Sequence, residues 1–344
     1  MVAGRPKITV FGAGMIGLYV GGLLARHAEL TFVGRASMLN PLTDGLRLTD
    51  VDGMDLQLGR QDFRVTTDAT GLAGADLVLL TVKSMGTAEA AAAIAAHAPG
   101  AVVVSFQNGV SNPDVLRAAL PGAMVLAGMV PFNVAQRGPA HLHRGTGGGL
   151  MVEASAALAP FEGVFAAAGL PLGQSSNIIG VQWGKLLVNL NNAINALSGV
   201  SLADELRQRD FRRCWALCLA EGLQCTKAAG IELVDPLPMP LKLMPQIMRL
   251  PDALYRYVLS AGSGGKVKVD PHARSSMADD LGKGRATEVD WLQGEVVRLA
   301  ERLVRRAPVN ARLVELVKAA EAGAGPWGAA ALLRELTAAR RGGE

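Results

Sequence analysis

Apolar residues in the first third of the chain occur in short runs that are bounded by turn-forming residues. The runs cover residues 8–11, 29–33, 77–82 and 101–106. A helical pattern follows the first run, and the Ala-rich residues 88–98 predict another helix between the third and fourth runs. Strands that alternate with helices predict a parallel sheet that is covered by helices on both faces.

The pattern changes near residue 124. Short β-type runs at 124–130, 140–144 and 150–152, separated by Gly and Pro, predict antiparallel strands at the edge of that sheet. A helix over residues 157–168 and a short strand near 170–174 complete the first domain. We expect this domain to be of the α/β, Rossmann type and to span residues 1–177.

Helical periodicity dominates from residue 178 onward. It covers residues 178–197, 211–229, 239–259, 288–305 and 311–322. Five prolines between residues 236 and 251 break the third segment into short pieces, and residues 262–265 predict a flexible loop. We expect residues 178–344 to form an all-helical domain.

Composition narrows the class of protein. With 344 residues, 50% of them apolar, the chain is long enough for two cores. The net charge is only +4, and Lys and Arg are scattered without interleaved aromatic residues, so we expect no nucleic-acid partner. No apolar run is long enough to span a membrane, and no signal-peptide pattern is present, so we expect a cytoplasmic protein.

The three cysteines, Cys214, Cys218 and Cys225, lie in one helical segment. An odd number at such spacing argues against a disulfide framework, and no His stands at a ligand spacing from them, so we expect no metal site. Small buried side chains in a reducing compartment fit this pattern. Exposed apolar helix faces would allow a homodimer.

A glycine-rich turn follows the first predicted strand and opens the first predicted helix. Gly12 permits a tight turn, Gly14 lets the backbone approach a pyrophosphate, and Gly17 allows close packing of helix on strand. The N–H groups at the helix start, those of Met15, Ile16 and Gly17, would face the phosphates. This context predicts dinucleotide binding.

The end of the second strand distinguishes between the two nicotinamide dinucleotides. An NAD site usually carries Asp or Glu there, to accept a hydrogen bond from the ribose 2′-OH. Here the strand ends in Gly34 and Arg35, and no carboxylate occurs before Asp44. An Arg in this place pairs with a 2′-phosphate, so we expect NADPH. The alternative is that Arg35 is an ordinary surface residue.

Five groups of residues, in the same order, resemble the ketopantoate reductase (2-dehydropantoate 2-reductase) family. They are residues 12–17, Thr-Val-Lys at 81–83, Phe-Gln-Asn-Gly at 106–109, Trp-Gly-Lys-Leu-Leu-Val-Asn at 183–189, and Arg-Ser-Ser-Met at 274–277 with Thr-Glu-Val-Asp at 287–290. The last two groups are the most specific, and the resemblance covers most of the chain. It implies an NADPH-dependent reductase of ketopantoate, a small 2-oxo acid.

The resemblance gives roles to two residues that follow strands. It places Lys83 near the cofactor and substrate, and Asn108 in contact with the nicotinamide side of the cofactor or with the substrate. Both positions fall at the carboxyl edge of a parallel sheet, where open α/β folds bind ligands. From the residues alone, Lys83 could also be a solvated loop residue, and Asn108 would form a turn in any case.

Lys185 is the candidate general acid. It lies in an apolar helical segment, where partial burial lowers the pKa of a Lys from about 10.4 toward neutrality. Reduction of a carbonyl needs a proton donor, and no His lies in a suitable motif. The family assigns this role to the Lys of the motif, which also contacts the substrate. The alternative is a Lys whose charged end reaches solvent.

Glu288 has two compatible interpretations. It begins a predicted helix after Thr287, where Thr caps and a carboxylate interacts favourably with the helix dipole. By resemblance it is catalytic and lies at the cofactor, near the nicotinamide ribose.

Further polar residues are candidates for substrate contacts. Asn189 lies one turn beyond Lys185 and Asn192 nearly two, so the three share a helix face. The family pattern Asn-x-x-Ile-Asn is not reproduced, because Asn195 lies six residues after Asn189. Either Asn192 takes the second role, or a helix bulge brings Asn195 round. Ser276 stands at the position of the family's substrate-binding Ser.

Three other functions fit parts of the pattern. The chain could reduce another branched or larger 2-oxo acid, because residues 236–251 make it longer than a minimal family member and can reshape the pocket. The presence of both Lys185 and Glu288 argues against a protein that only senses NADPH. The last motif group argues against a β-hydroxyacid dehydrogenase, which also joins a Rossmann domain to helices.

Overall fold

The computed structural model describes residues 4–263 and 273–343, and the chain divides between residues 178 and 179 into two compact units. The strands of the first unit are β1 (Lys7–Phe11), β2 (Glu29–Val33), β3 (Leu46–Asp50), β4 (Asp55–Leu58), β5 (Arg64–Thr66), β6 (Leu77–Leu80), β7 (Val102–Ser105), β8 (Met124–Met129), β9 (Val134–Gly138), β10 (His141–Arg144), β11 (Met151–Glu153) and β12 (Gly173–Ser175). Its α-helices are α1 (Met15–Leu24), α2 (Ala36–Leu39), α3 (Thr87–His97), α4 (Asn112–Ala119) and α5 (Ala159–Ala167).

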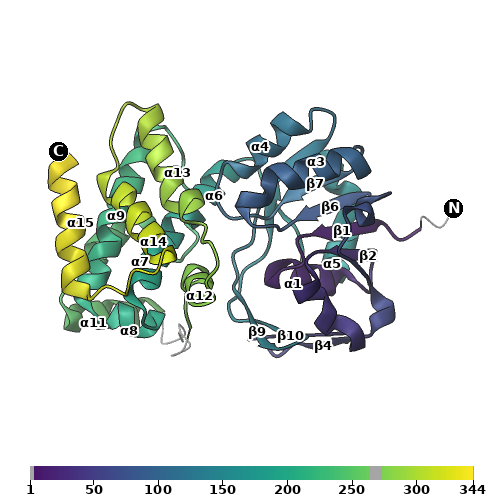
Figure 1. The fold of residues 1–344 in the computed structure, drawn as a ribbon, viewed down its shortest axis with the longest axis horizontal. Coiled ribbons are helices and arrows are strands. Elements are labelled where there is room, and N and C mark those ends of the chain that lie inside the picture. Colours follow the sequence, from purple (N-terminus) through teal and green to yellow (C-terminus); the bar gives the residue numbers. More distant parts are fainter. Residues whose placement is uncertain (1–3, 264–272, 344) are drawn as a thin grey trace. The chain divides into compact units, whose positions relative to one another are not determined.

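Eight strands form the main sheet, in the order β12-β11-β8-β7-β6-β1-β2-β5. The neighbours from β8 to β5 all pair in parallel. Helices α3 and α4 lie on one side of these strands, and α1 and α5 lie on the other (Figure 1). The predicted α/β class of this part of the chain is confirmed.

Alternate residues of β6 face two different apolar cores. Leu77 and Leu79 belong to the core that includes α1 and α5, while Val78 and Leu80 belong to the core that includes α3 and α4. A strand that is buried on both faces gives a continuous apolar run in the sequence, which explains why this strand was predictable. The sheet holds the loops that follow β1, β6 and β7 in fixed positions.

The prediction for the strands after residue 124 is partly wrong. β8 pairs with β7 in parallel, because α4, which periodicity did not reveal, provides the crossover that a parallel pair requires. β10 belongs to a separate four-stranded sheet of order β4-β3-β10-β9, where it finds a parallel partner in β3. β11 is antiparallel to β8 toward the edge of the main sheet, as expected.

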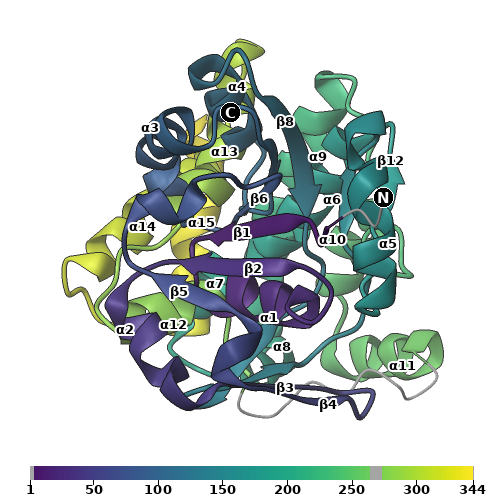
Figure 2. The ribbon, with the colours of Figure 1, turned by 90° about the vertical axis from the view of Figure 1, so that its right-hand side faces the viewer.

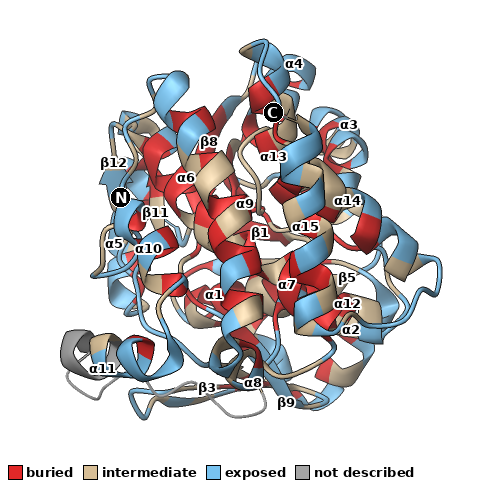
Figure 3. Ribbon diagram, turned by 90° about the vertical axis from the view of Figure 1, so that its left-hand side faces the viewer, coloured by how far each residue is buried: buried red, intermediate tan, exposed pale blue. Residues whose placement is uncertain are grey.

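The second unit is helical, which confirms the predicted class. Its α-helices are α6 (Ile178–Asn189, which begins at the boundary), α7 (Asn191–Ser198), α8 (Leu202–Arg207), α9 (Arg209–Ala228), α10 (Met244–Met248), α11 (Asp252–Ser263), α12 (Ser276–Gly282), α13 (Val289–Arg302), α14 (Pro308–Glu321) and α15 (Ala329–Gly343). Figure 3 shows that α7 and α9 are buried along much of their length. None of the helices in the described part of the chain is long and apolar enough to cross a membrane.

Two helical predictions need correction. Residues 178–197 form two helices that are interrupted at Leu190, whose carbonyl oxygen accepts a hydrogen bond from Gln293 Nε2 at 2.8 Å. Leu190 keeps helical dihedral angles of −57° and −23°, so the interruption is local. The predicted loop at 262–265 is also shorter at its start, because α11 continues to Ser263. Gly264 and Gly265 lie outside the described residues.

Candidate active site

The glycine turn is held by the two strands that flank β1. The backbone N–H groups of Gly12 and Ala13 both donate to the Val33 carbonyl oxygen, at 2.9 and 3.1 Å. On the other side, the Thr81 hydroxyl donates to the Gly12 carbonyl oxygen at 2.6 Å. The turn is therefore fixed between the ends of β2 and β6.

The three glycines of the turn have different steric surroundings. A Cβ at Gly12 would lie 2.3 Å from the Val82 nitrogen, and one at Gly17 would lie 2.5 Å from the Gly12 carbonyl oxygen. Gly12 also has a φ of +107°, which L side chains rarely adopt. A Cβ at Gly14, by contrast, would meet nothing closer than 4.0 Å. Gly12 and Gly17 thus serve packing, whereas Gly14 leaves open space where a pyrophosphate can approach the backbone.

Helix α1 presents three backbone donors at this turn. The N–H groups of Met15, Ile16 and Gly17 have no acceptor within the described residues, as is usual for the first turn of a helix. Together with the helix dipole they favour an anion. These residues fit the phosphates of a dinucleotide.

Arg35 lies directly beside the glycine turn. A Cβ at Gly34 would come within 2.6 Å of the Ala13 Cβ, so the end of β2 packs against the turn. The Arg35 side chain is exposed, and no carboxylate of the described residues lies within ion-pair distance of it. Because β2, β1 and β6 lie side by side (Figure 2), Arg35, the glycine turn and Lys83 follow one edge of the sheet.

Lys83 and Asn108 follow two neighbouring parallel strands, β6 and β7. A buried Asn112 ties the two loops together, since its Nδ2 donates to the Asn108 carbonyl oxygen at 2.6 Å and to Ser84 Oγ at 3.0 Å. The sequence pattern alone did not indicate a role for Asn112. Its only local indication is an Asn before a Pro at the start of a helix.

Lys185 lies on α6 between the buried Trp183 and the buried Leu186, and its own side chain is partly buried. Burial lowers the pKa of Lys185 to about 8, and the Glu288 carboxylate acts in the opposite direction. At neutral pH most of the Lys185 side chains still carry the proton, yet they release it far more readily than a solvated Lys does. Such a group can protonate a carbonyl oxygen and stabilise negative charge on it.

Glu288 is held at the start of α13 through Thr287. The Oε1 atom of Glu321 accepts hydrogen bonds from the backbone nitrogen and the hydroxyl of Thr287, both at 2.7 Å. The Thr287 hydroxyl accepts the N–H of Val289 at 3.3 Å, although Glu288 itself occupies the N-cap position. Glu288 therefore begins a helix and also acts on the charge of Lys185.

The Asn residues of α6 and α7 differ in burial. Asn189 and Asn192 are partly exposed, whereas Asn195 is fully buried. Asn195 Oδ1 accepts the backbone N–H of Ser275 at 2.8 Å, and its Nδ2 donates to the Val200 carbonyl oxygen at 3.1 Å. Both polar atoms of Asn195 are thus engaged within the fold.

The two serines of the Arg-Ser-Ser-Met motif also differ. Ser275 is buried, and its hydroxyl accepts the N–H of Ala278 at 3.1 Å and donates to the Asn192 carbonyl oxygen at 3.2 Å. Ser276 is the first residue of α12 and is exposed. Ser275 therefore anchors α12 against α7, and Ser276 is presented next to that anchor.

The segment that leads into the Pro-rich residues packs against α6. A Cβ at Gly184 would lie 2.1 Å from the Val234 carbonyl oxygen, and the Val234 N–H donates to the Gly180 carbonyl oxygen at 3.2 Å. On a helix, Lys185 points about 100° away from Gly184. This contact therefore covers a different side of α6 from the one that carries Lys185.

The three cysteines contribute no reactive thiol. Cys214, Cys218 and Cys225 are buried, and burial raises the pKa of each thiol. No cluster of three or more His, Cys, Asp or Glu residues in the described chain is arranged to hold a metal ion.

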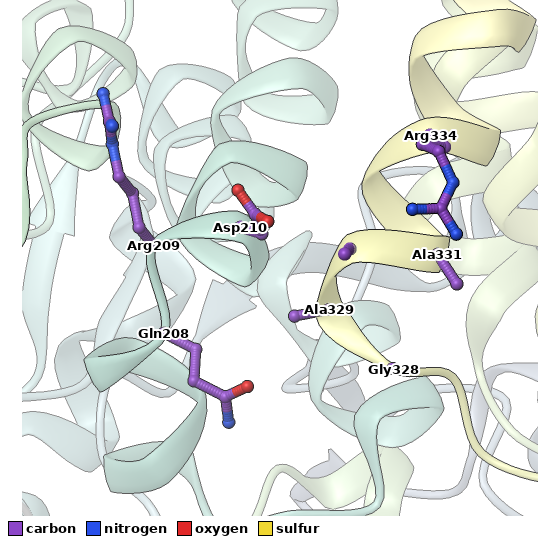
Figure 4. Close-up of a pocket in the computed structure, with 8 residues that line it drawn as sticks. Gln208, Arg209, Asp210, Gly328, Ala329, Ala331 and Arg334 are labelled. Atoms are coloured by element: carbon purple, nitrogen blue, oxygen red, sulfur yellow. The ribbon is translucent and has the colours of Figure 1, made fainter.

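An open hollow of about 610 Å³ lies at the starts of α9 and α15 and contains none of the predicted site residues. It is lined by Gln208, Arg209, Asp210, Gly328, Ala329, Ala330, Ala331 and Arg334 (Figure 4). The Arg209 side chain extends away from α15 and donates to the Arg249 carbonyl oxygen at 3.1 and 3.0 Å. Arg209 is therefore engaged elsewhere.

Comparison with known proteins identifies the family. Residues 8–156 match the family described as "Ketopantoate reductase PanE/ApbA", and residues 177–321 match "Ketopantoate reductase PanE/ApbA C terminal". The matching family is one of 2-dehydropantoate 2-reductase-like oxidoreductases. The chain belongs to the ketopantoate reductase PanE/ApbA family, which confirms the resemblance found in the sequence.

Individual relatives cover nearly the whole chain. The 2-dehydropantoate 2-reductase of Halobacterium salinarum is 29% identical over 92% of this chain and 99% of its own length. The crystal structure of a PanE/ApbA family ketopantoate reductase from Ralstonia eutropha JMP134 is 31% identical, covers 92% of this chain and 98% of that one, and has a TM-score of 0.77. A D-mandelate dehydrogenase solved with NADH and anilino(oxo)acetate shares the fold, at 19% identity, with 92% and 98% coverage and a TM-score of 0.72.

Proposed function

We propose that this protein reduces 2-dehydropantoate (ketopantoate) to pantoate with NADPH, a step of pantothenate biosynthesis in the cytoplasm. The observation that carries the proposal is the state of Lys185. This amine is partly buried, burial lowers its pKa to about 8, and the Glu288 carboxylate acts to raise that pKa. It lies in the part of the chain that matches the family's C-terminal domain. The name of the relative from Halobacterium salinarum supports the choice of substrate.

The residues of the first unit support the choice of cofactor. Residues 1–177 would form the NADP-binding domain, with the phosphates at Gly12, Gly14, Gly17 and the N–H groups of Met15 and Ile16. Arg35, exposed beside this turn, would pair with the 2′-phosphate.

Lys83 and Asn108 stand beyond β6 and β7, farther along the same edge of the sheet from β2. In this assignment both lie toward the nicotinamide half of the cofactor. Asn108 would contact either the nicotinamide or the substrate.

The residues of the second unit support the reaction, so residues 178–344 would form the catalytic domain. NADPH, when bound, supplies the hydride that adds to the 2-oxo carbon. Lys185 donates its proton to the carbonyl oxygen and stabilises the charge that develops there. Glu288 favours the protonated form of Lys185.

For the substrate contacts we assign Asn189, Asn192 and Ser276, which are all at least partly exposed. The burial and internal hydrogen bonds of Asn195 favour Asn192 over Asn195 as the second substrate-binding Asn. In this assignment Asn195 acts by holding Ser275, next to Ser276.

The test is the oxidation of NADPH with a panel of 2-oxo acids that includes ketopantoate and the oxo acid corresponding to mandelate, with NADH as the control cofactor. Selective turnover of ketopantoate with NADPH is the expected result. Turnover of another oxo acid would replace the substrate but keep the Lys185 mechanism. Tight NADPH binding without any turnover would leave an NADPH sensor.

A further inference from the structure

A buried polar cluster joins the loop after β6 to the loop after β7. Its centre is Asn112, which is 1% exposed. The two Nδ2 hydrogens of Asn112 are used by two acceptors, the Asn108 carbonyl oxygen at 2.6 Å and Ser84 Oγ at 3.0 Å. Its Oδ1 lies 2.8 Å from the Thr87 hydroxyl. We name Asn112, Ser84, Thr87 and the Asn108 carbonyl the loop bridge.

The loop bridge is tied to the sheet. Gln107 Nε2 donates to the Thr87 hydroxyl at 2.7 Å, and Ser105, the last residue of β7, donates to Gln107 Oε1 at 2.9 Å. Ser84 Oγ also donates to the Asn108 carbonyl oxygen at 3.2 Å. The two loops therefore cannot shift relative to each other without breaking buried hydrogen bonds, which are costly to leave unmade.

The residues on either side of the bridge are the ones assigned above to the nicotinamide half of the cofactor. Lys83 precedes Ser84 directly, and the Asn108 carbonyl is itself part of the bridge. The Asn112 side chain is buried, so it acts through these neighbours. The glycine turn, assigned above to the phosphates, is held separately by hydrogen bonds with Val33 and Thr81.

We propose that Asn112 is a positioning residue for the nicotinamide half of the cofactor, because it sets the spacing between Lys83 and Asn108. This inference rests on the proposed function, in which those two residues face that half. Loss of the Asn112 amide would remove the buried donor that the Ser84 hydroxyl and the Asn108 carbonyl oxygen share, and both loops would rearrange. The adenosine half would keep its site.

The experiment compares two ligands. NADPH carries both halves, whereas adenosine 2′,5′-bisphosphate carries the 2′-phosphate and the adenosine but no nicotinamide. Calorimetric titration of each ligand, well below the unfolding temperature, is done with the wild type, Asn112→Ala and a control, Asn310→Ala. Asn310 is 0% exposed and donates from Nδ2 to the Cys218 carbonyl oxygen and to Glu221, but it lies in the helical unit.

For Asn112→Ala we expect the Kd for NADPH to rise roughly tenfold or more, and the Kd for the bisphosphate to stay within about twofold. Asn310→Ala should change neither Kd by more than about twofold. An equal loss of affinity for both ligands in Asn112→Ala, or no loss for NADPH, would overturn the proposal. A wild type that binds NADPH without turnover refutes the proposed reaction but not this inference, whereas one that binds neither ligand refutes both.

A second variant covers the case in which Asn112→Ala does not fold. A protonated Asp at this position can donate one hydrogen bond, whereas an ionised Asp can donate none. The measured quantity is the Kd of Asn112→Asp for NADPH divided by the Kd of the wild type at the same pH. We expect this ratio to be smaller at low pH than at high pH. If Asn112 had a purely structural role, the Tm of Asn112→Asp would change. The ratio of variant Kd to wild-type Kd would then be the same for NADPH and for the bisphosphate.

Discussion

Burial and the carboxylate of Glu288 shift the pKa of Lys185 in opposite directions. Burial has the larger effect and lowers the pKa of Lys185 to about 8, while Glu288 raises it. The amine is therefore protonated at neutral pH but is a much stronger acid than a Lys in water. The balance between burial and the Glu288 carboxylate predicts a pH dependence for the proposed reaction.

We expect kcat to fall as the pH rises through about 8, because Lys185 must be protonated to donate. In Glu288→Gln the carboxylate that raises this pKa is lost, so the fall should begin at a lower pH. Profiles of kcat against pH, at saturating substrate, measure both inflections. A profile that stays flat beyond the pKa of a solvated Lys would exclude Lys185 as the proton donor.

Lys185→Met should lose catalytic activity without losing stability at pH 7. The folded-state pKa of Lys185 lies below the ordinary value of 10.5, so the charged Lys opposes folding below pH about 8, and this effect disappears as the pH rises to 10.5. We expect the variant to unfold at or above the wild-type Tm at pH 7, with turnover reduced by about 100-fold or more. Its advantage in Tm should shrink at alkaline pH. A clearly lower Tm at pH 7 would contradict this account of Lys185.

Gly14→Ala should weaken NADPH binding, whereas Gly17→Ala should lower the stability of the fold. A methyl group at Gly14 meets no protein atom closer than 4.0 Å, so Gly14→Ala should fold with a near-normal Tm but bind NADPH weakly. At Gly17 a Cβ would lie 2.5 Å from both the Gly12 carbonyl oxygen and Thr81 Oγ1, so Gly17→Ala should lose about 1–3 kcal/mol of stability. Thermal unfolding and NADPH titration check both. Normal NADPH affinity in a folded Gly14→Ala would move the pyrophosphate away from this turn.

Arg35→Ala should change the choice of cofactor. Loss of charge-assisted hydrogen bonds to a 2′-phosphate costs about 1.5–3 kcal/mol, so KM for NADPH should rise by roughly 10- to 100-fold. KM for NADH should stay within about twofold, because NADH has no 2′-phosphate. Equal effects on both cofactors would assign Arg35 to another role.

The two candidate Asn residues should give opposite results. Asn192→Ala should raise KM for the oxo acid with little change in Tm, since its side chain is partly exposed. Asn195→Ala should lower the Tm, because the Ser275 N–H and the Val200 carbonyl lose their buried partner. Steady-state kinetics and calorimetry on both variants test this. An unchanged KM in Asn192→Ala would return the substrate role to another Asn.

The central strands could be predicted from the sequence because they are buried on both faces. The apolar run at 29–33 coincides with β2, and the run at 8–11 falls within β1. β5 could not, since it has only three residues and none is fully buried. Helix α4 was missed as well, and with it the parallel pairing of β8, because its eight residues give too short a periodic pattern.

The sequence by itself determined those parts of the site that depend on local chemistry. A glycine turn between a strand and a helix, an Arg at a strand end and a Lys in an apolar helix are defined by residues close together in the chain. Only the tertiary structure revealed the hydrogen-bond partners of Asn112 and Asn195. Asn195 binds the backbone of a residue 80 positions away and Asn112 the hydroxyl of one 28 positions away. A buried amide takes its role from the partners that packing brings to it, and those partners cannot be identified from its neighbours in the chain.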